Sequence, residues 1–511
     1  MSIHPTIKLL LIFISGVFLS LSAPGYDLWF LAWVAISPLF IAINTSKRIK
    51  DAVVYSFLFG FGYNFWYLKW IYSLHPLEWL GFDTKSSILI SLLAYIVVVT
   101  YNGLFFALFG FIVGCHKKFS LSPYSRGISN LILISIIWLI VFNKLMSCKY
   151  LLGFPWTLVE YSQYKNLFLI QIAEYCGSIS ISFLIVFFNQ VLANFLIWLF
   201  NIQKIAERFV PREPGQLELI IKGFSCALLL ISTCLITGTF LYQKNQDSFS
   251  RKSHTISILQ GNLPIKATRG AGIDKNTARR IYSDLINKST TELFIIPEGA
   301  IPVIFQKDKS IKSWIKNTSK YKKSDIILGT YCKKEEGFTN CAAGSAYNSK
   351  GFSYYEKERL VPFGEFTPFY FILPEFLKRF ARSSIGEGYV EGKKNKPIEI
   401  SFGMAGISIC FELIFPTIIR KYSLKKSDLL INLSDLSWFS NDSLKKQFLG
   451  FAVFRAIENR KPVIIAANNG ISAFIEPSGK IKSQSIPNTQ GVLIDWVNTS
   501  KKITFYTKYG W

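Results

Sequence analysis

The sequence predicts an α-helical membrane domain of several spans, followed by an α/β domain. The first observation is composition: 50% of the 511 residues are hydrophobic and 16% are aromatic, which is too apolar for a simple soluble protein. The second is that long apolar segments fill the first half and stop near residue 250. The third is that short apolar strands then alternate with polar and helical segments.

Residues 1–245 are expected to form the membrane domain, with about seven helices that approach the roughly 20 residues a bilayer crossing needs. The first two apolar segments are short enough to form a tight hairpin instead. Residues 1–22 resemble a signal peptide, but Ser22-Ala23-Pro24 is a poor cleavage site and more spans follow, which favours a retained helix. The expected spans are 7–22, 28–44, 53–72, 87–114, 128–146, 177–200 and 219–242.

The loops between these spans alternate in charge. Basic loops follow the second, fourth and sixth spans, at residues 45–50, at 116–118 with Arg126, and at 203–208 with Arg212. The intervening loops, 73–85 and 148–165, are richer in aromatic and acidic residues. Because basic loops stay in the cytoplasm, the N-terminus is expected there, and an odd number of spans places residue 250 onward outside.

The net charge of +25 does not by itself indicate a nucleic-acid-binding protein. Lys and Arg form no obvious recognition helix, and a basic excess beside anionic lipid explains the charge more simply. The four histidines lie far apart, and no glycine-rich phosphate loop follows a strand. We therefore expect no metal site, no cofactor and no nucleic-acid partner.

Residues 250–500 are expected to form one α/β domain, followed by a C-terminal tail at 501–511. Hairpin-type turns are expected at 351–355 and at Pro477-Ser-Gly479. The expected strands are 255–259, 293–296, 326–329, 407–410, 429–432, 463–467 and 472–476, and the expected helices are 275–288 and 445–459.

Three reactive side chains lie at the edges of strand-like segments in this domain. Cys410 ends one strand, Glu298 follows another, and Lys357 comes just before an apolar turn. Such strand ends face the crevice where chemistry occurs in open α/β sheets. Glu298 would act as general base, Lys357 would favour a thiolate and stabilise an oxyanion, and Cys410 would carry an acyl group as a thioester. Alternatively, Cys410 is a small buried hydrophobic residue, as many lone cysteines are.

A set of motifs extends this pattern along the whole chain. The most specific combination is Leu-Val-Pro-Phe-Gly-Glu followed by Cys-x-Glu, in a chain whose first half has several expected spans. The motifs are Gly153-Phe-Pro-Trp156, Tyr161-Ser-Gln163, Leu259-Gln-Gly-Asn-Leu-Pro264, Pro297-Glu298, Tyr347-Asn348, Leu360-Val-Pro-Phe-Gly-Glu365, Cys410-Phe-Glu412, Asn432-Leu-Ser-Asp435, Trp438-Phe439 and Ala467-Asn-Asn-Gly470. Together they resemble the apolipoprotein N-acyltransferase family, a membrane-bound branch of the nitrilase superfamily.

The resemblance implies a nitrilase-like α-β-β-α sandwich with Glu298, Lys357 and Cys410 as catalytic residues. It also implies supporting roles for Glu365 and Glu412, whose alternative is an ordinary exposed charge. A phospholipid would acylate Cys410, and the thioester would pass its acyl chain to the α-amino group of a diacylglyceryl-cysteine at a lipoprotein's N-terminus. The protein would then be a monomer in the bacterial inner membrane, with the catalytic domain on the periplasmic side.

The chain departs from the family pattern in two places. Many members carry a tryptophan shortly after the opening strand, where this chain reads Ile265-Lys-Ala-Thr-Arg-Gly270. The family also usually ends with one more span, and this sequence stops at residue 511. Between the motifs, the aromatic segment 366–380 with its terminal Lys378 and Arg379 suits the membrane interface, unless it is a packed hydrophobic loop.

Two other functions fit parts of the sequence. A membrane-tethered amidase would use the same three residues on small amides, although the aromatic segment 366–380 favours lipid. A transporter with an outer solute-binding domain would need charges inside the spans, and these are few: Lys222 lies near a span end, where it can reach the interface.

A disulfide is expected between Cys332 and Cys341. Five of the eight cysteines lie in or beside spans and Cys410 is the proposed nucleophile, which leaves these two in the α/β domain. The segment between them predicts a hairpin that turns at Gly337, with the cysteines at opposed positions. An oxidising compartment would preserve the bond, whereas a flexible polar loop would leave two free thiols.

Overall fold

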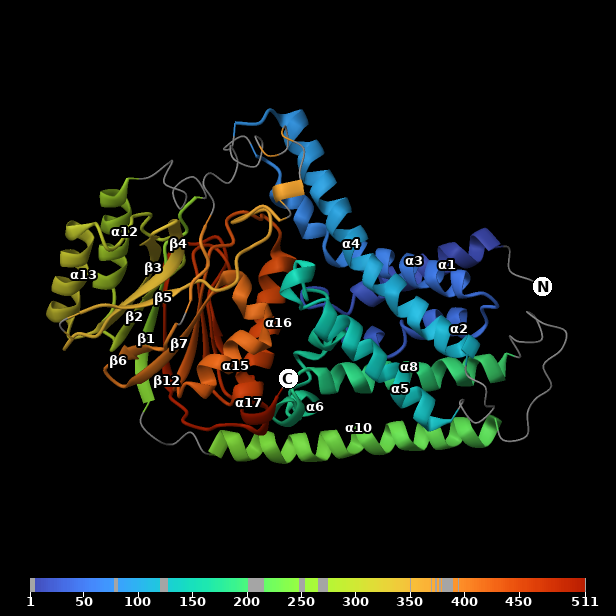
Figure 1. Ribbon diagram of the computed structural model, residues 1–511. Coiled ribbons are helices and arrows are strands. Elements are labelled where there is room, and N and C mark those ends of the chain that lie inside the picture. The colour runs from blue at the N-terminus through green and yellow to red at the C-terminus, as the bar shows by residue number, and fades with distance from the viewer. Residues whose placement is uncertain are drawn as a thin grey trace. The chain divides into compact units, whose positions relative to one another are not determined.

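The computed structural model divides the chain into two compact units, Met1–Glu78 with Phe82–Leu241, and Trp79–Gly81 with Tyr242–Trp511. Each unit is described by itself (Figure 1). Arg126, the basic loop 203–212 and the segment 265–270 lie outside the described residues. Those residues are 5–77, 81–119, 127–200, 216–247, 253–264, 274–349, 351–368, 370–372, 375, 378, 389–393 and 395–510.

The first unit is helical, and a helix overlaps every predicted span. Its elements are α1 Pro5–Ser20, η1 Trp29–Trp33, α2 Ser37–Asn44, α3 Ile49–Tyr67, η2 Lys69–Leu74, α4 Thr84–Phe119, α5 Ile128–Trp138, η5 Leu139–Leu145, η6 Lys149–Leu151, η7 Val159–Gln163, α6 Leu167–Ile170, α7 Ala173–Cys176, α8 Ile179–Leu199 and α10 Gln216–Asp247.

Among the described residues, four helices are long and apolar enough to cross a membrane: Thr84–Phe119, Ile128–Leu145, Ile179–Leu199 and Leu217–Asn245. Shorter apolar helices cover Thr6–Ser20, Trp29–Asn44 and Leu167–Cys176. The chain therefore has a multi-span helical domain, and the number of seven spans stays a prediction.

Glycines let α1 and α3 pack at short range. A Cβ atom on Gly62 would lie 2.3 Å from the carbonyl oxygen of Phe13, and one on Gly16 would lie 2.1 Å from that of Phe59. Both contacts are with rigid backbone, so only glycine permits this approach of the two helices.

Most residues of the motifs Gly153-Phe-Pro-Trp156 and Tyr161-Ser-Gln163 are buried inside the helical unit. Trp156 packs against Trp70 with ring centroids 4.9 Å apart. Gln163 donates a hydrogen bond of 3.0 Å to the carbonyl of Trp29 and accepts one of 3.2 Å from the indole of Trp33. The segment 153–163 therefore contacts two other connections between helices, one at Trp70 and one at Trp29 and Trp33.

The second unit contains two six-stranded sheets. The first sheet has the order β12-β1-β2-β3-β4-β5, with β1, β2 and β3 parallel and the other pairs antiparallel. Its strands are β1 Ser253–Gln260, β2 Leu293–Ile296, β3 Asp325–Lys334, β4 Gly337–Ser345, β5 Ser353–Glu356 and β12 Gly491–Asn498.

The second sheet has the order β11-β10-β9-β8-β7-β6, and its parallel strands are β7, β8 and β9. Its strands are β6 Ile398–Ile400, β7 Gly403–Ile409, β8 Leu429–Ser434, β9 Val463–Ala467, β10 Ala473–Ile475 and β11 Ile481–Gln484. All residues of β2 and β9 are apolar and buried, as expected for central parallel strands covered on both faces.

Helices cover the outer face of each sheet (Figure 1). Helices α12 Lys275–Asn287 and α13 Lys309–Lys322 pack on the first sheet, where their apolar residues form one core with β2 and β3. Helices α15 Pro416–Leu424 and α16 Asp442–Asn459 pack on the second sheet. Helix α17 Phe505–Tyr509 packs against these two helices. The predicted α-β-β-α sandwich is confirmed.

Several boundaries differ from the sequence prediction. Helix α16 begins three residues early, because the Asn441 side chain accepts a hydrogen bond from the Ser443 amide and caps the helix. Residues Ser353–Glu356 form β5 rather than part of a turn, since they pair with β4. Strand β7 ends at Ile409, one residue before Cys410. The predicted turn at Pro477-Ser-Gly479 is present.

The predicted disulfide joins Cys332 of β3 to Cys341 of β4, with Cα atoms 5.8 Å apart. The hairpin differs from the prediction in detail, because Glu335 and Glu336 form the turn and Gly337 opens β4. The cysteines are diagonal rather than opposed: Cys332 faces Thr339 in the register, and Cys341 faces Thr330. Diagonal positions share one face of the sheet, which is why the two side chains still meet.

Candidate active site

Cys410 lies on a sharp turn between a buried strand and a short helix. It follows β7 and opens η9 Cys410–Ile414, and its φ of +49° is in the left-handed region that non-glycine residues seldom adopt. The Asn432 amide donates a 3.2 Å hydrogen bond to its carbonyl oxygen. Cys410 as a whole residue is half-buried.

Glu412 holds this turn against the segment that carries Lys357. Its carboxylate accepts hydrogen bonds from the amides of Ile409 (2.7 Å), Glu358 (2.6 Å) and Arg359 (3.0 Å) and from the hydroxyl of Tyr355 (2.7 Å). The residue is fully buried, and burial raises its pKa to about 7 while the donors oppose that change.

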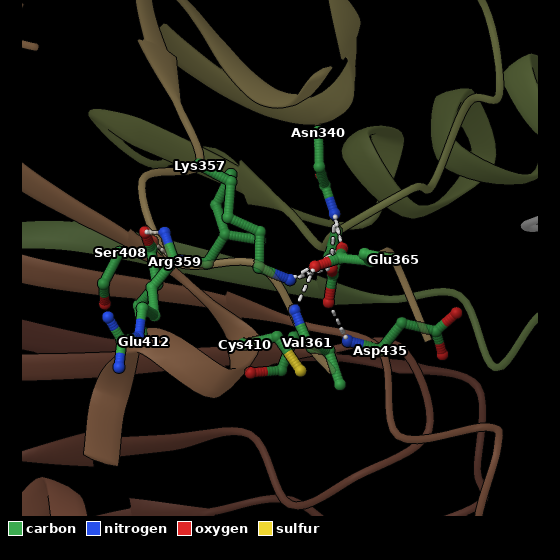
Figure 2. Close-up of polar contacts among 12 residues, drawn as sticks. Asn340, Lys357, Arg359, Val361, Glu365, Ser408, Cys410, Glu412 and Asp435 are labelled. Carbon is green, nitrogen blue, oxygen red and sulfur yellow. Dashed lines mark hydrogen bonds and ion pairs between the residues drawn. The ribbon is translucent and has the colours of Figure 1, made fainter. Parts of the chain in front are cut away.

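Lys357 follows β5 and is 1% exposed. Its Nζ lies 2.8 Å from Glu365 Oε1 and 3.5 Å from Glu298 Oε1. Its backbone is fixed as well, because its amide donates to the Asn340 carbonyl at 2.9 Å and its carbonyl accepts from the Gly392 amide at 2.7 Å. A backbone bonded on both sides therefore directs the ammonium at two carboxylates. Figure 2 shows it pointing at Glu365.

Glu298 lies directly beyond the central strand β2. Its Oε1 accepts from the Asn340 side-chain amide at 2.6 Å, and its Oε2 accepts from the backbone amide of Asp435 at 2.8 Å. The neighbouring strand approaches closely here, because a Cβ atom on Gly329 would lie 2.6 Å from the Cα of Glu298. Donors from both sheets thus fix the carboxylate.

Glu365 reaches the same place through the turn formed by Leu360-Val-Pro-Phe-Gly-Glu365. The amide of Glu365 donates to the Val361 carbonyl at 2.9 Å, and the Val361 amide donates back to Glu365 Oε2 at 2.9 Å. Phe363 has a φ of +61°, which tightens the turn. The motif therefore folds into a compact loop whose last side chain points at Lys357.

Burial and charge set the protonation of this cluster. Burial raises the pKa of Glu298, against the pull of Lys357. Burial alone would lower the pKa of Lys357, but the carboxylates of Glu365 and Glu298 outweigh it and raise that pKa. Burial and then Glu298 raise the pKa of the Cys410 thiol, while Lys357 opposes them. The charged form of Lys357 and the protonated form of the Cys410 thiol are therefore favoured, and the raised pKa makes an ionised Glu298 a stronger base than an exposed carboxylate.

The structure brings all five predicted site residues together. Glu298 and Glu365 each contact Lys357, and Cys410 interacts electrostatically with all three. Figure 2 shows Lys357, Glu365 and Cys410 in this cluster. Glu412 reaches the site through backbone amides rather than through the other carboxylates.

Sequence reasoning missed Asn340, whose amide contacts both Glu298 and Glu365, and it assigned no contact to the backbone of Asp435. No sequence signal marks Asn340, because its burial and both contacts come from the tertiary structure. The Tyr347-Asn348 motif lies just beyond β4. The Tyr347 backbone amide donates a hydrogen bond to the Asp325 carboxylate, not to a residue of the site. In the described part of the chain, no group of His, Cys, Asp or Glu could hold a metal ion.

Two family models match the chain. The apolipoprotein N-acyltransferase N-terminal domain matches residues 15–191, and the carbon-nitrogen hydrolase model matches residues 274–501. An apolipoprotein N-acyltransferase of Geobacter metallireducens is 29% identical over 97% of this chain and 90% of its own length. One from Nostoc sp. is 27% identical over 96% of this chain and 94% of its own.

A solved structure of a carbon-nitrogen hydrolase superfamily protein from Xanthomonas campestris is also similar. It is 18% identical, covers 48% of this chain and 91% of its own, and has a TM-score of 0.38. The two family models match the helical unit and the α-β-β-α unit in order, and the curated relatives match nearly the whole chain. Along nearly its whole length, the chain is therefore similar to apolipoprotein N-acyltransferases.

Proposed function

We propose that this protein moves an acyl chain from a phospholipid to a lipoprotein through a thioester on Cys410. The acceptor is the α-amino group of a diacylglyceryl-cysteine at the lipoprotein's N-terminus. The observation that carries the proposal is the buried contact of Lys357 with Glu298 and Glu365 beside a strained cysteine, in a chain similar to apolipoprotein N-acyltransferases. Lys357 bonded to two carboxylates cannot be the base, which assigns proton transfer to Glu298.

The first half-reaction forms the acyl-enzyme. Glu298 accepts the thiol proton of Cys410, and the sulfur bonds to the ester carbonyl carbon of the phospholipid. The Lys357 ammonium stabilises the oxyanion of the tetrahedral intermediate. When the intermediate collapses, the ester C–O bond breaks and the lysophospholipid oxygen takes the proton from Glu298.

The second half-reaction transfers the acyl chain. The neutral α-amine of the acceptor attacks the thioester carbonyl, and Glu298 takes a proton from its nitrogen. The C–S bond then breaks, the sulfur recovers the proton from Glu298, and the acceptor leaves with a new amide bond. The thiol is restored, so one site serves both substrates in a ping-pong sequence.

The supporting residues have separate tasks in this proposal. Glu365 keeps Lys357 charged and directed at the site, because its carboxylate lies 2.8 Å from the ammonium. Glu412 keeps the Cys410 turn in place through its bonds to Ile409, Glu358 and Arg359. Neither carboxylate needs to touch the substrate for this role.

The proposal places the protein as a monomer in the bacterial inner membrane, with the catalytic unit on the periplasmic side and no nucleic-acid partner. Support comes from the alternating charge of the loops and from the disulfide, which persists in an oxidising compartment. Both substrates are lipid-anchored there, which suits a catalytic unit that follows membrane spans.

The deciding experiment incubates the purified full-length protein with phosphatidylethanolamine alone. We expect mass spectrometry to find one acyl chain on Cys410, sensitive to hydroxylamine, and lysophospholipid to appear before any acceptor is added. Lysophospholipid that appears only with acceptor would overturn the covalent intermediate. Hydrolysis of small amides without any acyl adduct from phospholipid would favour the amidase alternative.

A further inference from the structure

Asn340 lies between the two carboxylates that contact Lys357. Its Nδ2 is 2.6 Å from Glu298 Oε1 and 3.3 Å from Glu365 Oε1, the same two oxygens that face the Lys357 ammonium. Asn340 is 4% exposed. Figure 2 shows its side-chain nitrogen pointing toward Glu365. Two acceptor oxygens and two donor groups therefore form one closed, buried set.

This arrangement solves a charge problem. Two carboxylates and one ammonium carry a net negative charge in a buried site, where like charges repel strongly. The amide of Asn340 offers donors to both oxygens without adding charge of either sign. An aspartate there would add a third negative charge, and an apolar residue would leave Glu298 with one side-chain donor fewer.

The orientation of the Asn340 amide follows from the same contacts. Its oxygen cannot face two carboxylate oxygens, so its nitrogen must, and Oδ1 is left as a buried acceptor with no hydrogen-bond partner in the described part of the chain. Such an unpaired acceptor costs stability. The amide is therefore oriented toward its two carboxylate partners, and its oxygen goes without one.

The β3–β4 hairpin holds Asn340 rigidly. The next residue, Cys341, is bonded to Cys332, which prevents the two strands from sliding. Tyr331 faces Asn340 in the register and packs against Phe338, with ring centroids 6.0 Å apart. The Asn340 carbonyl also accepts from the Lys357 amide, so one residue contacts the backbone of the cation and both carboxylates.

We propose that Asn340 is a positioning residue, held by the disulfide-braced hairpin, that keeps Glu298 and Glu365 directed at Lys357 and Glu298 ready to accept the thiol proton. The inference rests on the proposed function and adds a residue to it. Asn340 acts through the two glutamates and touches no reacting atom.

The test measures acylation of Cys410 by phosphatidylethanolamine across a range of pH with the full-length protein. Asn340→Ala removes donors that favour ionised Glu298, so the rising limb of the rate profile moves to higher pH. The rate at neutral pH falls by roughly 10- to 100-fold, as for the loss of a hydrogen bond to a charged group. The KM for phospholipid stays unchanged, because Asn340 does not bind it.

The matched control is Asn459→Ala, which removes another fully buried asparagine that bonds to Arg455 and Thr507 in α16 and α17. It changes stability without moving the pH profile. If Asn340→Ala does not fold, Asn340→Ser replaces it, because a serine side chain is too short to reach both carboxylates. The same fall in rate and the same shift of the pH profile are expected. A wild-type rate and profile in a folded Asn340 variant overturns the inference alone, whereas no adduct in the unsubstituted protein overturns it together with the proposed function.

Discussion

At the scale of single residues, one group of the site supplies positive charge and two others exchange the proton. Lys357 keeps its proton because Glu365 and Glu298 surround it, and the Cys410 thiol keeps its own because burial and Glu298 oppose a thiolate. A thiol with a raised pKa attacks only when a base of raised pKa takes its proton in the same step, and Glu298 is such a base. A serine at this position has no comparable route to an anion.

Cys410→Ser is therefore expected to abolish acyl transfer while the protein folds and inserts. The hydroxyl is a far weaker nucleophile at neutral pH, and it is close enough to a thiol in size to leave the packing intact. The measurements are acyl-adduct mass spectrometry and turnover with a lipoprotein acceptor, next to thermal unfolding of both proteins. Near-normal turnover by the serine variant would remove Cys410 from the mechanism.

Glu412 gives a prediction for stability against pH. Burial raises its pKa from 4.5 to about 7, so the folded protein holds this proton more tightly than the unfolded chain does. Its contribution to the free energy of unfolding is then full below about pH 4.5 and is lost as the pH rises through about 7. Thermal unfolding of the full chain should show this loss relative to Glu412→Gln, which cannot titrate. A difference that grows with pH would mean that the four donors outweigh burial.

At the scale of elements, the sequence predicts those parts that hydrophobic pattern alone decides. Strands 293–296 and 463–467 match β2 and β9 at both ends, because every residue in them is apolar and buried. Strand β4 is absent from the expected strands and was indicated only by the predicted hairpin, because Cys341-Ala-Ala-Gly-Ser345 is made of small residues without alternation.

The misplaced end of β7 and the missed Asn340 have a tertiary cause. Cys410 has a left-handed φ, and the neighbouring Glu412 is bonded to the distant segment at Glu358 and Arg359, which no local pattern encodes. Asn340 reads as an ordinary polar strand residue until β2 and the Leu360–Glu365 turn place their carboxylates beside it. Residue types at the ends of strands, together with the order of the motifs, predicted the reactive side chains. Their arrangement depends on contacts between elements that are distant in the sequence.

The β3–β4 hairpin should lose stability when its disulfide is removed. We expect Cys332→Ser with Cys341→Ser to lower the free energy of unfolding by about 2 kcal/mol, since the bond closes a short loop. Both positions are fully buried, so the serines also lose apolar contact. Thermal unfolding with and without reductant checks this: the unsubstituted protein should lose stability on reduction, and the double variant should not respond. Free, alkylatable Cys332 and Cys341 in protein isolated without reductant would contradict the bond.

At the scale of the whole molecule, contacts inside the helical unit agree with the charge pattern of its loops. Lys117, in the second basic loop, donates to the carbonyls of Ile43 (3.2 Å), Asn44 (2.6 Å) and Ser46 (2.6 Å), which border the first basic loop. The two basic loops therefore share one end of the unit. The connections that carry Trp70 and Trp156 pack on each other through a separate ring contact. This pairing supports the proposed cytoplasmic and periplasmic ends.

Cysteine labelling tests the proposed orientation. Lys47→Cys places an exposed thiol in the first basic loop, and Tyr321→Cys places one on α13 of the catalytic unit, where the tyrosine is 84% exposed. In cells with a permeable outer membrane, a membrane-impermeant maleimide should label the thiol at position 321 and reach position 47 only after the inner membrane is opened. Labelling of the unsubstituted chain sets the background, because Cys176 is exposed. The reverse pattern would place the catalytic unit in the cytoplasm, where the Cys332–Cys341 bond would not persist.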